Sequence, residues 1–308
     1  MTAAEPYWNR VSEHCWAWIQ PDGSWFVNNA AIVADGAQLV AVDTLASVPR
    51  TRRYRAAIEE KFGHQVRTII TTHHHGDHSY GNFLFPEAAI VGQHRTRRGI
   101  LAAGEPPGPE GRPSYTPFDF GEIELSPPTI CFTDELTVWA GEVPCQVNSV
   151  GEVAHTADDS YVHLADEGVL ITGDLIFSGG TPFVLMGSLS GLERCLVEQL
   201  RPLGASVLVP GHGPVGGPEL IEDVLEHLRW LQRLAADGRR RGLSPLETAR
   251  SADLGRFAGW TDTERIVGNL HRAYAEADGL PAGEPLDYGA IIREMVQLRG
   301  GRRIEVCL

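Results

Sequence analysis

The stretch from Thr71 to His78, TTHHHGDH, decides the interpretation of this chain. It follows the apolar, strand-like segment Val66–Ile70, and open α/β sheets place their ligands at the carboxyl ends of such strands. Four imidazoles and one carboxylate within six residues are costly to bring together unless a bound cation removes the repulsion between protonated rings. A polar surface loop would not need this pattern, so the stretch indicates a metal site.

Three later apolar runs also end in glycine-bearing turns that carry histidine or aspartate. The residues delivered are His155, Asp174 and His212, which follow the runs 145–150, 168–172 and 206–210. Glycine lets the backbone turn tightly beside a crowded site. Each turn taken singly is ordinary, but four in order with the right residue types indicate one shared site. Imidazole and carboxylate donors suit zinc, and also iron or manganese.

The bulk composition excludes several classes of protein. The chain has 308 residues, a hydrophobic content of 43% and a formal net charge of -14, which fits one large core or a core with a satellite domain. Such an acidic chain repels phosphate backbones, so we expect no nucleic-acid partner. The start has no basic or apolar leader pattern and no apolar run reaches membrane-spanning length, so we expect neither signal peptide nor membrane span. The five scattered cysteines fit reduced thiols in a cytoplasmic protein.

The order of apolar segments predicts an α/β fold followed by helices. Two hairpin turns are expected at Pro21–Ser24 and at Asp35-Gly36, and a helix over Arg50–Phe62 that ends at Gly63. Further strand-like runs are 66–70, 89–91, 147–150, 161–164, 169–172 and 206–209, and helical patterns cover 192–200, 218–235, 245–251, 263–277 and 291–298. The segment Ala103–Pro117 is dense in glycine and proline, which indicates either a pocket wall or a surface insertion.

Over residues 25 to 215 the chain resembles the metallo-β-lactamase superfamily. The His-x-His-x-Asp-His motif of that family is matched by residues 73–78. The resemblance implies a four-layer αβ/βα sandwich, here a catalytic domain over residues 1–217, with a helical region over 218–308 that packs on or near the site. It also implies two zinc ions per chain, with iron or manganese as alternatives. The ligands implied are His73, His75 and His155 for the first metal, Asp77, His78 and His212 for the second, and Asp174 as the bridge. Asp77 would also orient the attacking water or pass a proton to the leaving group.

Several branches of the superfamily fit poorly. A bacterial β-lactamase should be exported and generally lacks the bridging aspartate, nucleases carry an extra domain and basic surfaces, and flavin-linked diiron reductases need a second domain. Persulfide dioxygenases use one iron, which the full ligand set disfavours. Hydrolysis of an ester, a thioester such as that of the glyoxalase II type, or a lactone remains, with an iron-bound redox relative as the alternative.

A softer resemblance points to the actinomycete aromatic-polyketide cyclases of this superfamily. It is carried by Gly179–Ser188 and Thr263–Glu276. It implies a substrate tethered to an acyl carrier protein, either cyclised or released by thioesterase action in antibiotic biosynthesis. An acidic carrier would need an arginine patch, for which residues 95–98 or 239–241 are candidates, although a solvated charged face accounts for both more simply.

Three features outside the metal motif are further candidates. Asp43 follows the apolar run Val40–Val42 and could orient a ligand imidazole. Trp25 and the apolar segment Gly179–Met186 could line the pocket, although both also fit an ordinary core. The sequence does not determine the oligomeric state.

Overall fold

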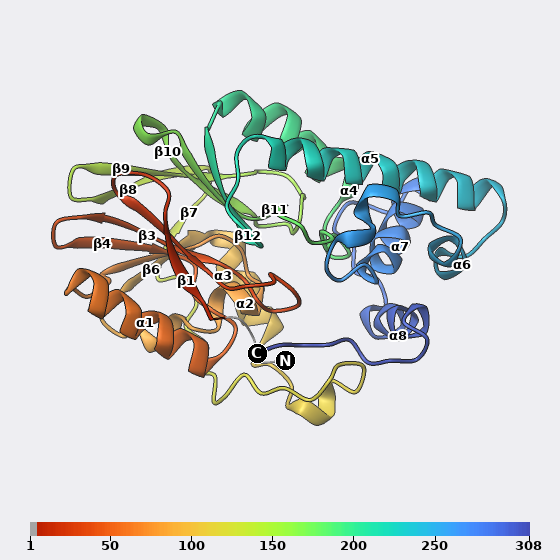
Figure 1. The fold of residues 1–308 in the computed structure, drawn as a ribbon, viewed down its shortest axis with the longest axis horizontal. Coiled ribbons are helices and arrows are strands. Elements are labelled where there is room, and N and C mark those ends of the chain that lie inside the picture. The colour runs from red at the N-terminus through yellow and green to blue at the C-terminus, as the bar shows by residue number, and fades with distance from the viewer. Residues whose placement is uncertain (1–4) are drawn as a thin grey trace.

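The protein was analysed as a computed structural model that describes residues 5–308, so residues 1–4, the first part of the leader region considered above, lie outside the described chain. Two β-sheets pack face to face (Figure 1). The seven-stranded sheet has the order β1-β2-β3-β4-β5-β6-β7 and the five-stranded sheet the order β12-β11-β10-β9-β8. The strands of the first sheet are β1 Tyr7–Arg10, β2 Cys15–Ile19, β3 Ala30–Asp35, β4 Gln38–Val42, β5 Thr68–Thr71, β6 Ala89–Gln93 and β7 Ile130–Phe132. Those of the second are β8 Glu135–Ala140, β9 Val143–Ser149, β10 Ser160–Leu164, β11 Val169–Phe177 and β12 Val207–His212.

Three buried clusters correspond to the interfaces between four layers. One lies between the two sheets and joins, for example, Val42 and Val147. A second lies between the first sheet and helix α1 (Val48–Phe62), where Tyr54 and Ile58 are buried. The third lies between the second sheet and the helices that cover it. The expected αβ/βα sandwich is therefore confirmed, because each sheet buries both faces.

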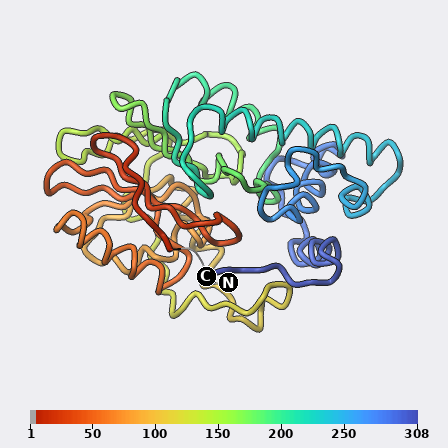
Figure 2. The backbone as a smooth tube through the Cα atoms, in the orientation of Figure 1, coloured from red at the N-terminus to blue at the C-terminus, as the bar shows by residue number. Residues whose placement is uncertain are grey.

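The helices that follow the sandwich in sequence form one group, drawn from teal to blue in Figure 2. The helices of the C-terminal group are α5 Glu219–Arg240, α6 Pro245–Arg250, α7 Arg265–Ala277 and α8 Tyr288–Leu298. Besides α1, the helices that precede this group are α2 Gly76–Ser79, α3 His94–Ala103 and α4 Leu189–Arg194. Helix α5 packs on β11 and on α4, and α7 packs on α5, α6 and α8. Since the same buried cluster contains residues of the sandwich and of these helices, the division at residue 217 stays a prediction.

The chain after α8 returns to the sandwich (Figure 1). Ile304 forms a parallel bridge with Tyr115, in the segment 103–117 that was expected to be irregular. That segment contains only a short 3-10 turn after α3 ends at Ala103. The tail therefore fixes a long loop that has little regular structure of its own.

Several element predictions need correction. The connection between β2 and β3 runs from residue 20 to 29, so Pro21–Ser24 is one turn within a longer loop rather than a tight hairpin. Strand β11 does not stop before Asp174 but continues to Phe177, because β12 stays beside it through two register shifts. The helix expected at 192–200 begins at Leu189 and changes to a π-helical turn over Cys195–Leu200. Strands β1, β7 and β8 were not expected.

Across residues 5–308, every helix is too short or too polar to cross a bilayer.

Candidate metal centre

Seven side chains from four separate segments converge at the edge where the two sheets meet. The loop after β5 and helix α2 supply His73, His75, Asp77 and His78, the loop after β9 supplies His155, and the strands β11 and β12 supply Asp174 and His212. Their donor atoms form two groups, each with all its atoms within 4.8 Å of one another. The seven residues expected from sequence are therefore brought together, and their role as metal ligands stays a prediction.

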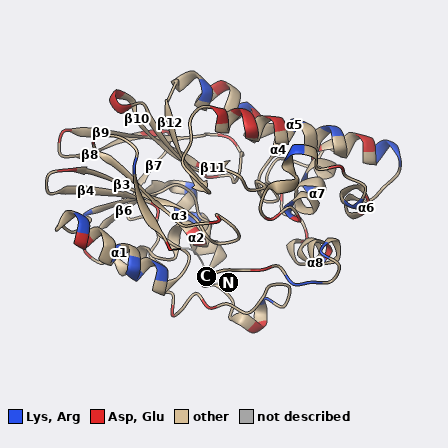
Figure 3. Cartoon of the chain, viewed as in Figure 1, with Lys and Arg blue, Asp and Glu red and all other residues tan. Residues whose placement is uncertain are grey.

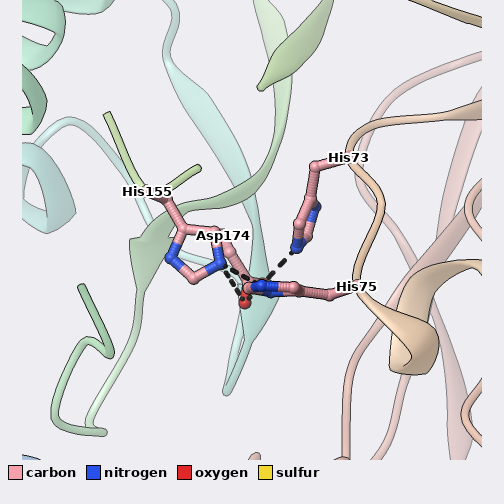
Figure 4. A group of neighbouring side chains, drawn as sticks. All are labelled: His73, His75, His155 and Asp174. Carbon is pink, nitrogen blue, oxygen red and sulfur yellow. Dashed lines mark hydrogen bonds and ion pairs between the residues drawn. The ribbon is translucent and has the colours of Figure 1, made fainter. Parts of the chain in front are cut away.

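The first group consists of three imidazoles around one carboxylate (Figure 4). His155 Nε2 lies 3.3 Å from Asp174 Oδ2 and 3.0 Å from His75 Nδ1. His73 Nε2 lies 4.0 Å from the same Asp174 oxygen. The ring nitrogens thus face a common point next to the Oδ2 atom.

The second group lies on the other side of that carboxylate. Asp174 Oδ1 is 3.0 Å from His78 Nε2 and 3.5 Å from His212 Nε2. Asp77 Oδ2 completes the group, at 3.3 Å from His212 Nε2. Asp174 therefore directs one oxygen to each group, which is the placement expected of a bridging ligand.

Asp43 orients this second group from the end of β4. Its Oδ2 accepts hydrogen bonds from His78 Nδ1 at 2.8 Å and Thr72 Oγ1 at 2.8 Å, and its Oδ1 accepts one from Thr72 N at 2.7 Å. Because Nδ1 of His78 is used in this bond, Nε2 is the free nitrogen that faces Asp174. The backbone of Asp43 has a φ of 61°, a left-handed conformation that is uncommon for residues other than glycine. The predicted orienting role of Asp43 agrees with this geometry.

Two glycines make room for the bridging carboxylate. A Cβ atom at Gly211 would lie 2.0 Å from Asp174 Oδ1, and one at Gly173 would lie 2.6 Å from Thr72 Oγ1. Gly173 also has a φ of +50°. At the turns that carry Asp174 and His212, glycine is therefore required by close approach at the site itself, whereas a Cβ atom at Gly151, before His155, would meet no atom within 4 Å.

The electrostatic environment keeps the three imidazoles of the first group neutral. Burial lowers the pKa of His73 and of His75 well below the usual range of histidine, and it lowers the pKa of His155 to about 4. Neutral imidazoles have a free lone pair, which is the form that binds a metal.

The carboxylates dominate the second group. Burial opposes charge on His78 and His212, but Asp174 is the strongest of the carboxylates that raise the pKa of both, to about 9 for His212. Burial also opposes the charge of Asp77, but His78 and His212 lower its pKa to about 2. Two ionised carboxylates therefore lie among five imidazoles, and a cation would replace the protons that now neutralise them.

The residues present fit metal ions on independent grounds. Within residues 5–308 no hydrogen-bond partner exists for the buried atom His73 Nε2. His78 Nε2 and Asp174 Oδ1 likewise form no hydrogen bond and face each other at 3.0 Å as a buried ion pair. Buried polar atoms are rarely left without a hydrogen bond, so all three atoms are candidate donors to a cation. A nitrogen and oxygen donor set of this kind suits zinc, and also iron or manganese.

A pocket with a cavity volume of about 110 Å³ opens over five of the seven residues, with His73 and His78 outside its lining. Its walls are Trp25, Phe26, His75, Gly76, Asp77, His155, Asp174, Phe177, Phe183, Met186, His212, Arg265 and Tyr288. The expectation that Trp25 and the segment 179–186 line the pocket therefore agrees with the structure. The Trp25 ring contacts Phe183 at a centroid distance of 4.9 Å, and Phe177 stacks on His212 at 4.9 Å.

Sequence reasoning missed the residues that the C-terminal helices add to this pocket. Arg265 begins α7, and its guanidinium carbon lies 4.3 Å from the centre of the Trp25 ring. It is almost fully buried, pairs with Asp262 at 2.8 Å and donates to Thr181 O at 3.0 Å. Tyr288 begins α8. The available signal was an arginine directly before the apolar pair Ile266 and Val267, since a charged residue on a buried helix face is uncommon.

Comparison with known proteins agrees with this geometry. Residues 23–212 match the family described as "Metallo-beta-lactamase superfamily". The chain is 26% identical to a linear primary-alkylsulfatase of Pseudomonas sp. (strain ATCC 19151) over 319 aligned positions, which cover 86% of this chain and 59% of that protein. It therefore spans less than two thirds of the length of this relative. It is also 23% identical to a Schizosaccharomyces pombe protein described as "Probable hydroxyacylglutathione hydrolase", over 67% of this chain and 76% of that protein.

Solved structures show the same fold at low sequence identity. The metallo-beta-lactamase FIM-1 from Pseudomonas aeruginosa, in its mono-zinc form, aligns with a TM-score of 0.59 at 18% identity over 74% of this chain and 97% of its own. A metallo-beta-lactamase from Pontibacter korlensis aligns with a TM-score of 0.59 at 21% identity over 73% of this chain and 99% of its own. Because the family match covers more than half of the residues and includes all seven donors, the chain belongs to the metallo-beta-lactamase superfamily.

Proposed function

We propose that this chain is a dinuclear metal-dependent hydrolase that cleaves an ester or thioester with an apolar acyl group. The observation that carries the proposal is the position of Asp174, whose Oδ2 faces His155 and whose Oδ1 faces His78. A carboxylate shared in this way, with neutral imidazoles on one side, supports two adjacent cations rather than one.

The residues around the donors support this chemistry. Two bound dications would polarise a carbonyl oxygen and bring the pKa of a water close to neutrality. Asp77 lies in the pocket wall 3.3 Å from His212 Nε2, where its carboxylate can accept a hydrogen bond from the attacking water and orient it. Trp25, Phe177 and Phe183 restrict the water around the acyl group.

Metal analysis and turnover of a small thioester test the proposal together. Purified protein should contain about two zinc ions per chain and hydrolyse an acetyl thioester, and the variant Asp174→Ala should lose at least about a thousandfold in kcat/KM. Full metal content and full activity in that variant would contradict the bridging role. Iron at one or two ions per chain, with no hydrolysis, would support the redox alternative instead.

Sulfate-ester hydrolysis is a second candidate. The alkylsulfatase match covers 86% of this chain, which includes most of the helical region, whereas the hydroxyacylglutathione hydrolase match covers 67%. Release of sulfate from dodecyl sulfate, measured beside thioester cleavage in the same preparation, separates the two. Faster turnover of the sulfate ester would replace the thioester proposal.

Ring closure on a carrier-bound polyketide stays a prediction, and the same metal centre would carry out this reaction. The aromatic walls suit a flat intermediate. The arginine run 239–241 is a weak docking patch for an acidic carrier, because Arg239 pairs with Asp278 and the next two arginines pair with Asp237. Product analysis with a thioester-linked polyketide analogue distinguishes the reactions, since hydrolysis gives a free acid and cyclisation gives a new ring chromophore.

A further inference from the structure

A second and larger cavity adjoins the metal pocket. It has a volume of about 890 Å³, and Phe26 and Tyr288 line both spaces. One wall is the irregular segment 106–115, and the opposite wall is α8 with the tail that follows it. The volume lies within the range of small-molecule binding sites, about 300–1,000 Å³.

The cavity reaches the metal loop through Tyr80. The ring of Tyr80 lies against Gly76, where an added Cβ atom would come within 2.2 Å of it. On the other side Tyr115 donates or accepts a hydrogen bond with Tyr288 at 3.0 Å between the hydroxyl oxygens. Phe26 and Tyr288 are the residues common to both spaces, so a substrate that fills both must pass beside these two rings.

Aromatic residues and prolines make up eight of the eighteen residues that line the cavity. They include Phe26, Tyr80, Tyr115, Phe120 and Tyr288, together with the prolines at positions 106, 107 and 113. Flat, rigid side chains favour the stacking of a planar apolar group over a flexible polar one.

The charge of the cavity is opposite to that of the molecule. Arg112, Arg293 and Arg303 line it and no aspartate or glutamate does, in a chain whose formal net charge is -14. Over residues 5–308 none of these three arginines forms an ion pair with a carboxylate. Figure 3 shows basic residues where α8 leads into the tail.

Arg112 gives the strongest support for an anion-binding role of this cavity. Its guanidinium carbon lies 4.0 Å from the centre of the Phe118 ring and 4.5 Å from that of Phe120, and its Nη2 donates to Phe118 O at 3.1 Å. Its Nε and Nη1 are buried and have no partner anywhere in the described chain. A guanidinium fork that lacks a carboxylate is costly to hold in place, and it matches an oxyanion in geometry.

We propose that this space, the arginine cavity, binds the part of the substrate remote from the scissile bond: a planar apolar body that ends in an oxyanion held by Arg112 and Arg293. The proposal rests on the proposed function, because it extends the acyl group cleaved at the metal centre into the adjoining space.

Equilibrium binding of a non-hydrolysable probe tests the inference. The zinc-loaded full chain is titrated with pyrenebutyrate and with the neutral pyrenebutanol, and binding is followed by pyrene fluorescence. The carboxylate should bind at least about tenfold more tightly than the alcohol, a ratio that one charge-assisted hydrogen bond supports. Equal affinity for the two probes would overturn the proposal.

The variants locate the anion. Arg112→Met should reduce the preference for the carboxylate to about twofold or less, Arg112→Lys should restore part of it, and the exposed Arg293 should contribute less. The matched control is Arg233→Met, an exposed arginine of α5 outside the cavity, which should keep the full preference. A full preference in both Arg112→Met and Arg293→Met, with unchanged melting temperatures, would mean that the anion binds at the metals and would overturn the assignment.

Wild-type hydrolysis of the acetyl thioester is measured in the same preparation. This substrate is too short to enter the arginine cavity, so its turnover reports on the proposed function alone. Turnover without any probe preference refutes only the cavity assignment, and probe preference without turnover refutes only the hydrolase.

Discussion

The sandwich and the C-terminal helices contribute to the same pocket in different ways. The sandwich supplies all seven metal-donor candidates, from loops and strand ends that are held by Asp43, Gly211 and short backbone contacts. The helices supply no donor to that set, but they add Arg265 and Tyr288 to its walls. The comparison indicates that the chemistry belongs to the strand ends, whereas the fit to a substrate belongs to the helices.

The largest effect expected outside the seven donor candidates tests the sandwich side of this comparison. In Gly211→Ala the new methyl group must displace the Asp174 carboxylate, since the Cβ atom would lie 2.0 Å from Oδ1. We expect a loss of at least about a hundredfold in kcat/KM and of about one metal ion per chain, as a displacement near 1 Å typically costs.

The control for this change is Gly259→Ala, where an added Cβ atom meets no atom within 4 Å. It should leave metal content and activity unchanged. Equal loss in both variants would point to general destabilisation and would contradict the role given to Gly211.

A smaller effect is expected at Asp43, which is not a metal-donor candidate but accepts a hydrogen bond from the donor candidate His78. Asp43→Asn keeps a residue that tolerates the left-handed backbone at φ 61° but removes the charge that faces His78 Nδ1. Metal affinity should fall by about tenfold to a hundredfold, the usual result of removing such an orienting group. Competition with a zinc chelator measures the affinity. Unchanged affinity would show that Asp43 supports only the backbone of Thr72.

On the helical side we expect a change in substrate binding rather than in chemistry. Arg265→Met removes the cation over Trp25, and Nε of Arg265, which has no partner among residues 5–308, is free to meet an anionic substrate group. KM for a carboxylated thioester should rise by about tenfold while kcat changes little. Steady-state kinetics on charged and neutral thioesters check the split. An equal fall in kcat for both thioesters would mean that Arg265 acts in the chemical step, and it would contradict the division of roles between the sandwich and the helices.

The smallest effect concerns the stability of the helical region. His227 is buried among Trp230, Phe257 and Trp260, and both its ring nitrogens lack a partner within the described residues. Burial lowers its pKa to about 3. The unfolded chain protonates this histidine near pH 6.5, whereas the folded chain keeps it neutral down to about pH 3. The contribution of neutral His227 to the free energy of unfolding is therefore full above pH 6.5 and is lost as the pH falls toward 3.

The variant His227→Phe should remove this part of the pH dependence. Between pH 7 and pH 4.5 the wild type should lose about 2–3 kcal/mol more unfolding free energy than the variant. Urea unfolding at the two pH values measures the difference. Parallel losses in both proteins would mean that His227 is protonated or hydrogen-bonded when folded.

The donors could be predicted from the sequence because their residue types and order are rare. Histidines and aspartates that each follow an apolar run seldom occur in this order unless they share a site. The predicted role of Asp43 also follows from a strand end, whereas that of Trp25 follows from its place at the tip of the expected first hairpin. The strands β1 and β7 could not be predicted, since each has three or four residues and no clear alternation.

The larger space could not be predicted for a different reason. Phe26 and Tyr288 line the same cavity although most of the chain separates them in sequence, and no local pattern encodes such a proximity. Arg112 has no distinguishing neighbours in sequence. Its unpaired atoms become visible only after the aromatic side chains around it are placed.

The tail after α8 has a further consequence for how this protein could diversify. Ile304 N donates to Ser114 O at 2.9 Å, Thr116 N donates to Ile304 O at 2.8 Å, and Val306 N donates to Thr116 Oγ1 at 3.0 Å. These hydrogen bonds join the tail to the segment that forms one wall of the arginine cavity, and none of them involves a metal-donor residue. Substitutions among the hydrogen-bonded residues can therefore change the shape of the cavity, and with it the range of accepted molecules, while the seven donors stay in place.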